Sequence, residues 1–231
     1  HTIMEKGECF DCAYSMGTEG ITYEISEDST HAIVTSCMEN LEEAMFSNIY
    51  QGLPVTEIKD GLFNNSHQIK SVIIPEGITI IGNEAFKDCV NLTKISIPDS
   101  VTTIGRRAFS RCAKLENIII PKGVTAIAEY AFEGCKQLKS ISISDCVTSI
   151  GDWAFAYCSE LTNLVIGEGV VNIGAFSFYE CQELKDVQID KGVTSIDAYA
   201  FYNCQGLTEI KIPEGVTFIG NNAFQNCIGL T

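Results

Sequence analysis

The strongest constraint on the fold of this chain is a phenylalanine that recurs at a fixed interval. Each copy stands 23 residues after the one before it, without insertion or deletion. The positions are Phe63, Phe86, Phe109, Phe132, Phe155, Phe178, Phe201 and Phe224. Self-similarity at such a period is the signature of a repeat array. The sequence therefore predicts a stack of similar coils.

One period contains two kinds of pattern. From Leu92 to Lys114 it reads LTKISIPDSVTTIGRRAFSRCAK. Its first part ends in an apolar and polar alternation rich in β-branched residues, which is typical of a strand. Pro98 ends this strand, and we expect it at the second position of a type I turn. The second part, residues 101–112, has apolar residues at spacings of 4, 1 and 3, which fit a short helical turn with one buried face.

A single coil of this length cannot be stable by itself. Fully burying one Val, Leu, Ile or Phe side chain contributes about 1.5 to 3 kcal/mol, whereas ordering the backbone costs about 1 to 2 kcal/mol per residue. Stacking resolves the deficit, because equivalent strands can pair about 4.8 Å apart and each coil covers its neighbour's core. We expect an α/β solenoid with a parallel β-sheet on one face and short helical turns on the other.

The pattern L-x-x-I-x-I-P-x-x-V-x-x-I-G-x-x-A-F-x-x-C resembles the 23-residue class of the BspA-like leucine-rich repeat family. The match covers residues 53–231. The segment GITYEISEDSTHAIVTS (residues 20–36) is similar to the β-hairpin that precedes the array in that family. The resemblance implies a leucine-rich-repeat arc with an N-terminal hairpin cap in residues 1–52. It also implies a non-enzymatic protein on bacterial or protist cell surfaces, often one that attaches to host matrix proteins or other cells.

The repeat departs from its pattern in the middle and stops short at the end. Ser144, Gly167 and Asp190 replace the turn proline, which we expect to loosen the turn without disturbing the apolar positions. The last repeat stops at residues 229–231, where its strand should begin. The first residues, HTIMEKGECF, have no leader pattern and do not begin with Met. We therefore expect a processed or truncated piece of a protein that continues beyond Thr231.

The net negative charge of the chain argues against two classes of partner, nucleic acids and anionic lipids. The chain has 30 acidic and 15 basic residues and a formal net charge of −15. A surface this acidic repels the phosphate backbone of nucleic acid and anionic lipid headgroups. No run approaches the roughly 18 apolar residues that a membrane-spanning helix needs. We expect no nucleic-acid partner and no direct membrane insertion of this segment, while the oligomeric state stays open.

Eleven cysteines raise the question of disulfides and reactive thiols. Seven share one repeat position: Cys89, Cys112, Cys135, Cys158, Cys181, Cys204 and Cys227. We expect them to form a column of small buried thiols that pack as hydrophobic side chains. Cys146 falls in a turn and should be exposed, and the redox state of Cys37 and Cys146 stays open.

Cys9 and Cys12 have C-x-x-C spacing near the amino terminus. The pair leaves three alternatives: free thiols in the cap, a local disulfide, or a metal site completed by His1, His31 or Cys37. The sequence shows no flanking motif for Ser/His/Asp or Cys/His catalysis, no phosphate loop and no calcium loop. We predict that the chain is not an enzyme and has no catalytic residue, cofactor site or metal site.

The variable positions of the repeat form the surface columns of a solenoid, so they should carry its function. Two residues before the recurring phenylalanine, four consecutive repeats have an aromatic ring, and three tyrosines lie nearby. The candidate binding residues are Tyr130, Trp153, Tyr157, Phe176, Tyr179, Tyr199 and Tyr202. At about 100° per residue they should point away from the buried face. The rings either staple neighbouring coils together or form an exposed strip that contacts a partner.

The outward strand positions form the other candidate surface. They are mostly small and polar, like Ser140 and Asn163, with isolated apolar residues such as Ile119. A flat face of this kind suits a protein ligand better than a small molecule. The leading hypothesis is a secreted or cell-surface domain that binds a protein or glycoprotein in adhesion. The alternative is a structural spacer or stalk that carries another domain, and the sequence does not choose between the two faces.

Overall fold

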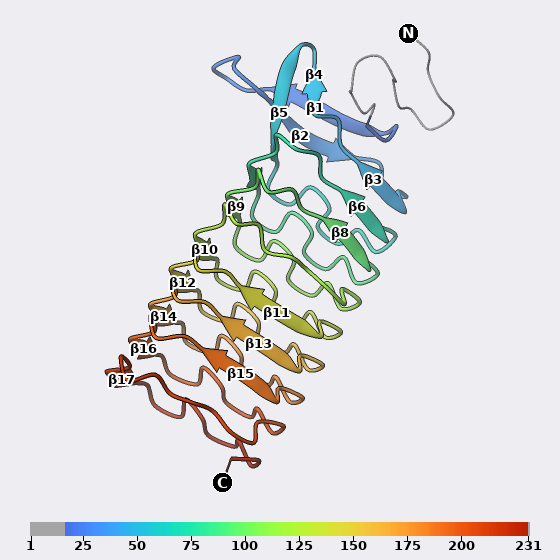
Figure 1. Cartoon of the computed structure of the whole chain (residues 1–231). Coiled ribbons are helices and arrows are strands. Elements are labelled where there is room, and N and C mark those ends of the chain that lie inside the picture. Colours follow the sequence, from blue (N-terminus) through green and yellow to red (C-terminus); the bar gives the residue numbers. More distant parts are fainter. Residues whose placement is uncertain (1–16, 231) are drawn as a thin grey trace.

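The structure of the chain is a computed structural model that describes residues 17–230. It is an elongated stack in which successive 23-residue repeats form successive coils (Figure 1). Most coils contribute two short strands, one to each of two sets of parallel strands. The predicted solenoid with parallel sheet is confirmed, although the sequence indicated one set of strands rather than two.

An antiparallel hairpin covers the first coil. β1 (Ile21–Ile25) pairs with β2 (Ala32–Cys37), as the sequence predicts for residues 20–36. β2 also pairs in parallel with β5 (Leu53–Ile58), so the hairpin extends the strands of the array. It thereby covers backbone groups that an uncapped first coil would expose.

Two strand ladders run along the stack. The strands of the first are β3 (Glu43–Met45), β6 (Ser71–Ile73), β8 (Lys94–Ser96), β11 (Ser140–Ile143), β13 (Asn163–Ile166) and β15 (Asp186–Ile189). The second continues from β5 through β7 (Ile80–Ile81), β9 (Thr103–Ile104), β10 (Ala126–Ile127), β12 (Ser149–Ile150), β14 (Asn172–Ile173), β16 (Ser195–Ile196) and β17 (Phe218–Ile219). The remaining strand, β4 (Ile49–Tyr50), pairs antiparallel with β5. Within the array each paired residue meets its equivalent in the next repeat, as Ser140 meets Asn163.

Both strand ladders are interrupted at the same junction between coils. In the second ladder the interruption lies between β9 and β10 of successive coils, whereas in the first it extends over one further junction, because the coil between those of β8 and β11 contributes no strand there. Residues 117–120 belong to no strand, and Ile119 is 82% exposed. The opposite side of the same coils stays bonded, because the Phe109 N–H donates to the Ala131 carbonyl at 2.8 Å. We call this place the unpaired junction.

The recurring phenylalanine lies on a side built from turns, and the predicted helical turns are wrong. Residues 17–230 contain no helix. In every coil, the residues two before and two after the phenylalanine have a positive φ. Around Phe155 these are Trp153, with φ 61°, and Tyr157, with φ 60°. A left-handed residue at every fourth position ends the regular i to i−4 bonding of a helix.

Alternate backbone groups on this turn side bond to the next coil. The N–H groups of Trp153, Phe155 and Tyr157 donate to carbonyls of the following coil at 2.9, 2.8 and 2.7 Å. The intervening N–H groups donate within their own coil, as Ala154 does to the Gly151 carbonyl at 3.3 Å. The turn side therefore holds neighbouring coils together in the same way as the strand ladders do.

The turn after each first-ladder strand begins at the proline. The Pro98 carbonyl accepts a bond from the Val101 N–H at 3.1 Å, so proline occupies the first turn position and the predicted second position is wrong. The repeats without proline keep the same bond. Ser144, Gly167 and Asp190 accept it at 3.1, 3.2 and 3.4 Å. The expected loosening is absent because the bond uses a carbonyl, which every residue has.

One continuous core runs through the stack. The recurring phenylalanines lie face to face, with the ring centroids of Phe109 and Phe132 5.5 Å apart and the planes 4° from parallel. The Val, Ile, Leu and Ala positions around them are almost fully buried. Because each fully buried Val, Ile, Leu or Phe side chain contributes about 1.5 to 3 kcal/mol, adjacent coils supply the stability that a single coil lacks.

Candidate functional site

The seven aromatic residues singled out in the sequence form one connected group on the turn side. Four rings lie one above another, with adjacent centroids 5.9, 4.3 and 4.7 Å apart and planes within 6° of parallel: Tyr130, Trp153, Phe176 and Tyr199. Beside them, Tyr179 stacks on Tyr202 at 4.9 Å. Tyr157 meets Tyr179 edge to face at 5.5 Å. We call these seven side chains the aromatic cluster.

The backbone under the four stacked rings is strained. Tyr130, Trp153, Phe176 and Tyr199 all have φ between 57° and 61°, a region that costs an ordinary L-residue roughly 1 to 2 kcal/mol. Ring stacking is worth about 0.5 to 1.5 kcal/mol per pair beyond the area that it buries. Stacking therefore offsets the strain, which favours the interpretation that the rings staple neighbouring coils.

The partial exposure of these side chains leaves open the second interpretation, that the rings form a strip that contacts a partner. The stacked rings are half-buried, and their faces cover one another, so the part that reaches solvent is the ring edge. Tyr157 is 40% exposed. Burial raises the pKa of the Tyr157 hydroxyl above its ordinary value of 10.0, and the nearby Glu180 and Glu133 add to that rise. Tyr157 is therefore a neutral hydrogen-bonding group at neutral pH.

The aromatic cluster ends beside a group of positive charges that the sequence analysis missed. The chain has three arginines, and all of them stand in one repeat: Arg106, Arg107 and Arg111. The guanidinium carbon of Arg107 lies 4.5 Å from the centroid of the Tyr130 ring, and that of Arg106 lies 5.2 Å from it. Such cation–π contacts contribute about 0.5 to 1 kcal/mol at exposed sites. The uneven distribution of arginine along the chain was the signal that could have revealed this group.

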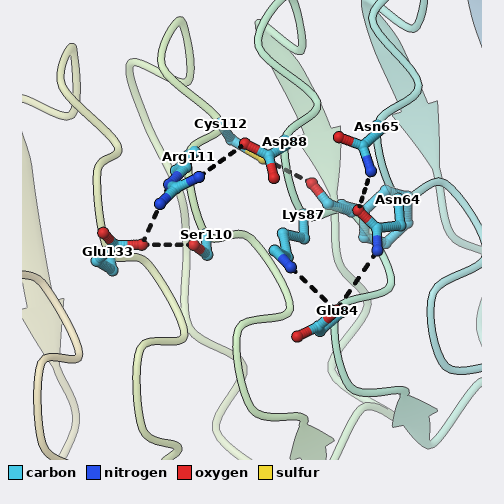
Figure 2. Close-up of polar contacts among 10 residues, drawn as sticks. Asn64, Asn65, Glu84, Lys87, Asp88, Ser110, Arg111, Cys112 and Glu133 are labelled. Carbon is cyan, nitrogen blue, oxygen red and sulfur yellow. Dashed lines mark hydrogen bonds and ion pairs between the residues drawn. The ribbon is translucent and has the colours of Figure 1, made fainter.

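A cleft of about 210 Å³ lies between two of these arginines, Arg107 and Arg111, and the aromatic cluster. Its lining residues are Lys87, Arg107, Ser110, Arg111, Tyr130, Glu133, Trp153 and Tyr157. Figure 2 shows that Arg111 lies between the carboxylates of Asp88 and Glu133 from neighbouring coils, with nitrogen to oxygen distances of 3.7 and 3.9 Å. The Ser110 hydroxyl donates to Glu133 at 2.5 Å. We call this place the arginine cleft.

The recurring cysteines form the buried column that the sequence predicts. Each Sγ lies 3.0 to 3.3 Å from the carbonyl oxygen of the phenylalanine 26 residues earlier, as Cys158 does from Phe132. Burial raises the pKa of Cys89 to about 12 and that of Cys158 well above its ordinary value of 9.0. The same rise holds for the column from Cys89 to Cys181, and these thiols are therefore poor nucleophiles. The nine cysteines in the described part of the chain are all free, and Cys146 is exposed as predicted.

The remaining chemical candidates lie at or near the amino terminus. Cys9, Cys12 and His1 fall outside the described residues, so the alternatives for that pair stay open. His31 lies in the β1–β2 turn, with its Nδ1 3.0 Å from the Thr30 hydroxyl. Within residues 17–230, no group of three or more His, Cys, Asp or Glu side chains is placed to hold a metal ion. No helix in that part of the chain has the length and apolarity to cross a bilayer.

Comparison with known proteins relates this geometry to a family. The sequence matches the family described as BspA type leucine rich repeat region over residues 56–175 and 103–231. A leucine-rich cell surface protein from Faecalibacterium prausnitzii A2-165 is 30% identical over 94% of this chain, with a TM-score of 0.66. The chain spans about half of that protein's length, 53%.

A second solved structure has the same fold over most of its length. The leucine-rich repeat protein of T. pallidum is 26% identical over 92% of this chain and 89% of its own chain, with a TM-score of 0.68. No curated protein matches this sequence.

Proposed function

Because the chain belongs to the BspA-type leucine-rich repeat family, we propose that it is a non-enzymatic binding domain that adheres to a protein or glycoprotein of a host or neighbouring cell. We place it in a secreted or cell-surface protein, an assignment supported by the 30% identical relative described as a cell surface protein. The proposal keeps residues 1–52 as the cap and 53–231 as the binding array. The aromatic cluster is the observation that carries it.

Rigid aromatic side chains are effective contact residues. Tyr and Trp are enriched among the few interface residues that supply most of the binding energy. A flexible side chain loses about 0.5 to 1.5 kcal/mol of entropy when a partner immobilises it. Stacked rings such as Trp153, which lies 4.3 Å from Phe176, have lost this freedom already. The aromatic cluster is therefore a pre-organised surface for a partner.

The outward face of the first strand ladder is a weaker candidate. Its apolar residues, such as Ile73 at 51% exposure and Ile119 at 82%, are separated along the stack by Ser96. Isolated apolar residues of this kind are normal on a protein surface. The turn side, where seven rings are connected, is the face that we assign to the partner.

Adhesion is tested with the purified chain on immobilised extracellular-matrix proteins and on intact cells. We compare the original chain with Trp153→Asn and Tyr199→Asn, because Asn222 occupies the same repeat position. Phe218→Asn is the matched control, since Phe218 is an exposed aromatic outside the aromatic cluster and Asn172 is its equivalent. We expect a loss of affinity of about tenfold or more for the first two variants and none for the control. Unchanged binding by folded Trp153→Asn and Tyr199→Asn would remove the aromatic cluster as the contact surface.

One observation favours the alternative role of a structural spacer or stalk. The faces of the four stacked rings are turned to each other, so the aromatic cluster stiffens the stack whether or not a partner binds. A stalk predicts that Trp153→Asn lowers the unfolding temperature and alters no interaction. Measuring both quantities on the same variant separates the two roles.

A further inference from the structure

The arginine cleft differs chemically from the rest of this acidic protein. Its lining contains three cationic side chains, one carboxylate, one hydroxyl and three aromatic rings, and no aliphatic side chain. The chain as a whole has a net charge of −15. Two further carboxylates border the cleft, with Glu84 3.2 Å from Lys87 and Asp88 3.7 Å from Arg111, so the attraction for an anion comes from the exposed Arg111 guanidinium and not from an excess of positive charge.

Two guanidinium groups in the cleft have unused hydrogen-bonding capacity. Arg111 approaches Asp88 and Glu133 only to 3.7 and 3.9 Å, beyond hydrogen-bond distance, and its side chain is 60% exposed. The Nε of Arg107 has no partner among the described residues but is buried, so Arg107 can offer a ligand only the terminal nitrogens of the guanidinium that lies against the Tyr130 ring. A guanidinium is a planar fork of donors that matches a carboxylate with two parallel hydrogen bonds. The cleft is therefore suited to an anion with two oxygens in one plane.

We propose that the arginine cleft binds the carboxylate of one acidic sugar unit, a uronic or sialic acid in a glycan. Arg107 and Arg111 hold the carboxylate, and the exposed ring of Tyr157 contacts the apolar face of the sugar. Glu133 and Ser110 hydrogen-bond to its hydroxyl groups. The inference deepens the proposed function and rests on it only in placing the binding surface on the turn side.

Size and lining favour a sugar over an acidic peptide. A volume of about 210 Å³ is below the roughly 300 to 1,000 Å³ of pockets for drug-sized ligands, so it admits one small unit. An acidic peptide would bring several carboxylates close to Glu133 and to Asp88, which would repel them. A ligand with many charges would also be repelled by the surrounding acidic surface. One carboxylate on a neutral, hydroxyl-rich ring meets all three conditions.

The experiment titrates the chain with small probes and follows binding by NMR and calorimetry at low salt. The probes are methyl α-D-glucuronide and 3′-sialyllactose, each with its neutral counterpart, methyl α-D-glucoside and lactose. Hexaglutamate is the peptide probe. We expect at least one acidic sugar to bind about tenfold or more tightly than its neutral counterpart, because one charged hydrogen-bonded pair is lost in the latter. Which of the two binds identifies the sugar.

The chain itself supplies matched variants. Arg107→Asn and Arg111→Asn should weaken the binding about tenfold or more, and Arg106→Asn should not. Arg106 does not line the cleft and pairs with Glu129 at 3.1 Å. Asparagine already stands at the three equivalent positions, as Asn222, Asn65 and Asn83. Thermal unfolding of each variant verifies that it is folded.

Four outcomes overturn the inference. They are equal binding of the neutral sugars, equally tight binding of hexaglutamate, loss of binding in Arg106→Asn as well, and absence of binding by both acidic sugars. Tyr199→Asn separates this proposal from the proposed function, because Tyr199 belongs to the aromatic cluster and not to the cleft lining. It should weaken adhesion to a protein partner about tenfold or more and leave the binding of the sugar unchanged.

Discussion

At the scale of the residue, the repeat allows each side chain to be compared with its equivalents in the same molecule. Ser177 stands where Ala108, Ala131 and Ala154 stand in other coils. Its hydroxyl oxygen is buried and has no hydrogen-bond partner in the structure. A buried hydroxyl group without a partner loses its hydrogen bonds to water and forms none in the protein, which destabilises the folded state. This position therefore lowers stability in an otherwise well-packed core.

We expect Ser177→Ala to raise the free energy of unfolding by about 1 kcal/mol. Removing one oxygen atom leaves little cavity, and the removed group makes no hydrogen bond. Urea unfolding at neutral pH measures the change. Ser110→Ala is the control, because the Ser110 hydroxyl is buried and donates to Glu133, so its loss should destabilise the chain. A decrease in stability on Ser177→Ala would show that its hydroxyl does have a partner.

The buried cysteine column makes stability depend on alkaline pH. Burial raises the pKa of the five column thiols from Cys89 to Cys181 above the ordinary value of 9.0, whereas a hydrogen bond with Cys204 lowers the pKa of Cys227 in the last coil. Their contribution is fully present below pH 9 and is lost as the pH rises above it, because the unfolded chain then releases protons that the folded chain keeps. Each thiol accounts for about 1.4 kcal/mol per pH unit in that range.

The free energy of unfolding should therefore fall steeply above about pH 9, the ordinary thiol value. Urea unfolding between pH 7 and pH 10 measures the slope. Cys158→Ala should reduce the slope by about 1.4 kcal/mol per pH unit, the share of one thiol. Cys146→Ala is the control, because Cys146 is exposed. A slope that Cys158→Ala leaves unchanged would contradict the assignment to the column.

At the scale of the element, the sequence predicts which residues are buried better than it predicts the backbone. Ala154, Phe155 and Cys158 are buried in the structure, as they would be on one face of a helical turn. A helical turn and the observed turns bury the same residues, so the apolar spacing could not distinguish between the two backbones. Gly61 and Gly134 share repeat positions with Trp153 and Tyr157, and glycine is typical of a positive φ. The aromatic residues in the same columns concealed that signal.

The balance between strain and stacking can be measured within one column. Trp153→Asn relieves roughly 1 kcal/mol of backbone strain but removes stacking on Tyr130 and Phe176. Because burial and stacking of a large ring outweigh that relief, we expect a loss of about 1 to 3 kcal/mol. Glu84→Asn, at the equivalent position, loses a partly exposed pair with Lys87 and a long hydrogen bond from the Asn64 amide at 3.4 Å, and should change stability by less than about 1 kcal/mol. Urea unfolding compares them, and a stabilising Trp153→Asn would show that the rings do not staple the coils.

At the scale of the whole molecule, the candidate site depends on contacts between coils. Lys87, Arg111, Glu133 and Tyr157 come from four successive repeats and meet in one cleft. Columns of equivalent residues can be read directly from a periodic sequence, and the aromatic cluster was found in that way. The arginine cleft runs diagonally across several columns, so it becomes visible only when the coils are stacked.

The unpaired junction should be where the stack opens first. The stability of a solenoid is close to a sum of terms from neighbouring coils, and this junction lacks pairing in both strand ladders. Hydrogen exchange should therefore be about tenfold or more faster in residues 117–120 than in β13, which pairs on both sides. The Phe109 N–H, bonded across the same junction, should remain protected.

Protection of Phe109 distinguishes opening on the strand side alone from separation of the two halves. Equal exchange in residues 117–120 and β13 would mean that the ladders pair across the junction in solution.

The position of the unpaired junction bears on ligand binding, because the repeat with all three arginines lies on one side of the junction and Tyr130 on the other. The arginine cleft spans both sides. Because the turn side stays bonded when the strand side opens, an acidic sugar that bridges Arg111 and Tyr157 should bind both forms and leave exchange in residues 117–120 unchanged.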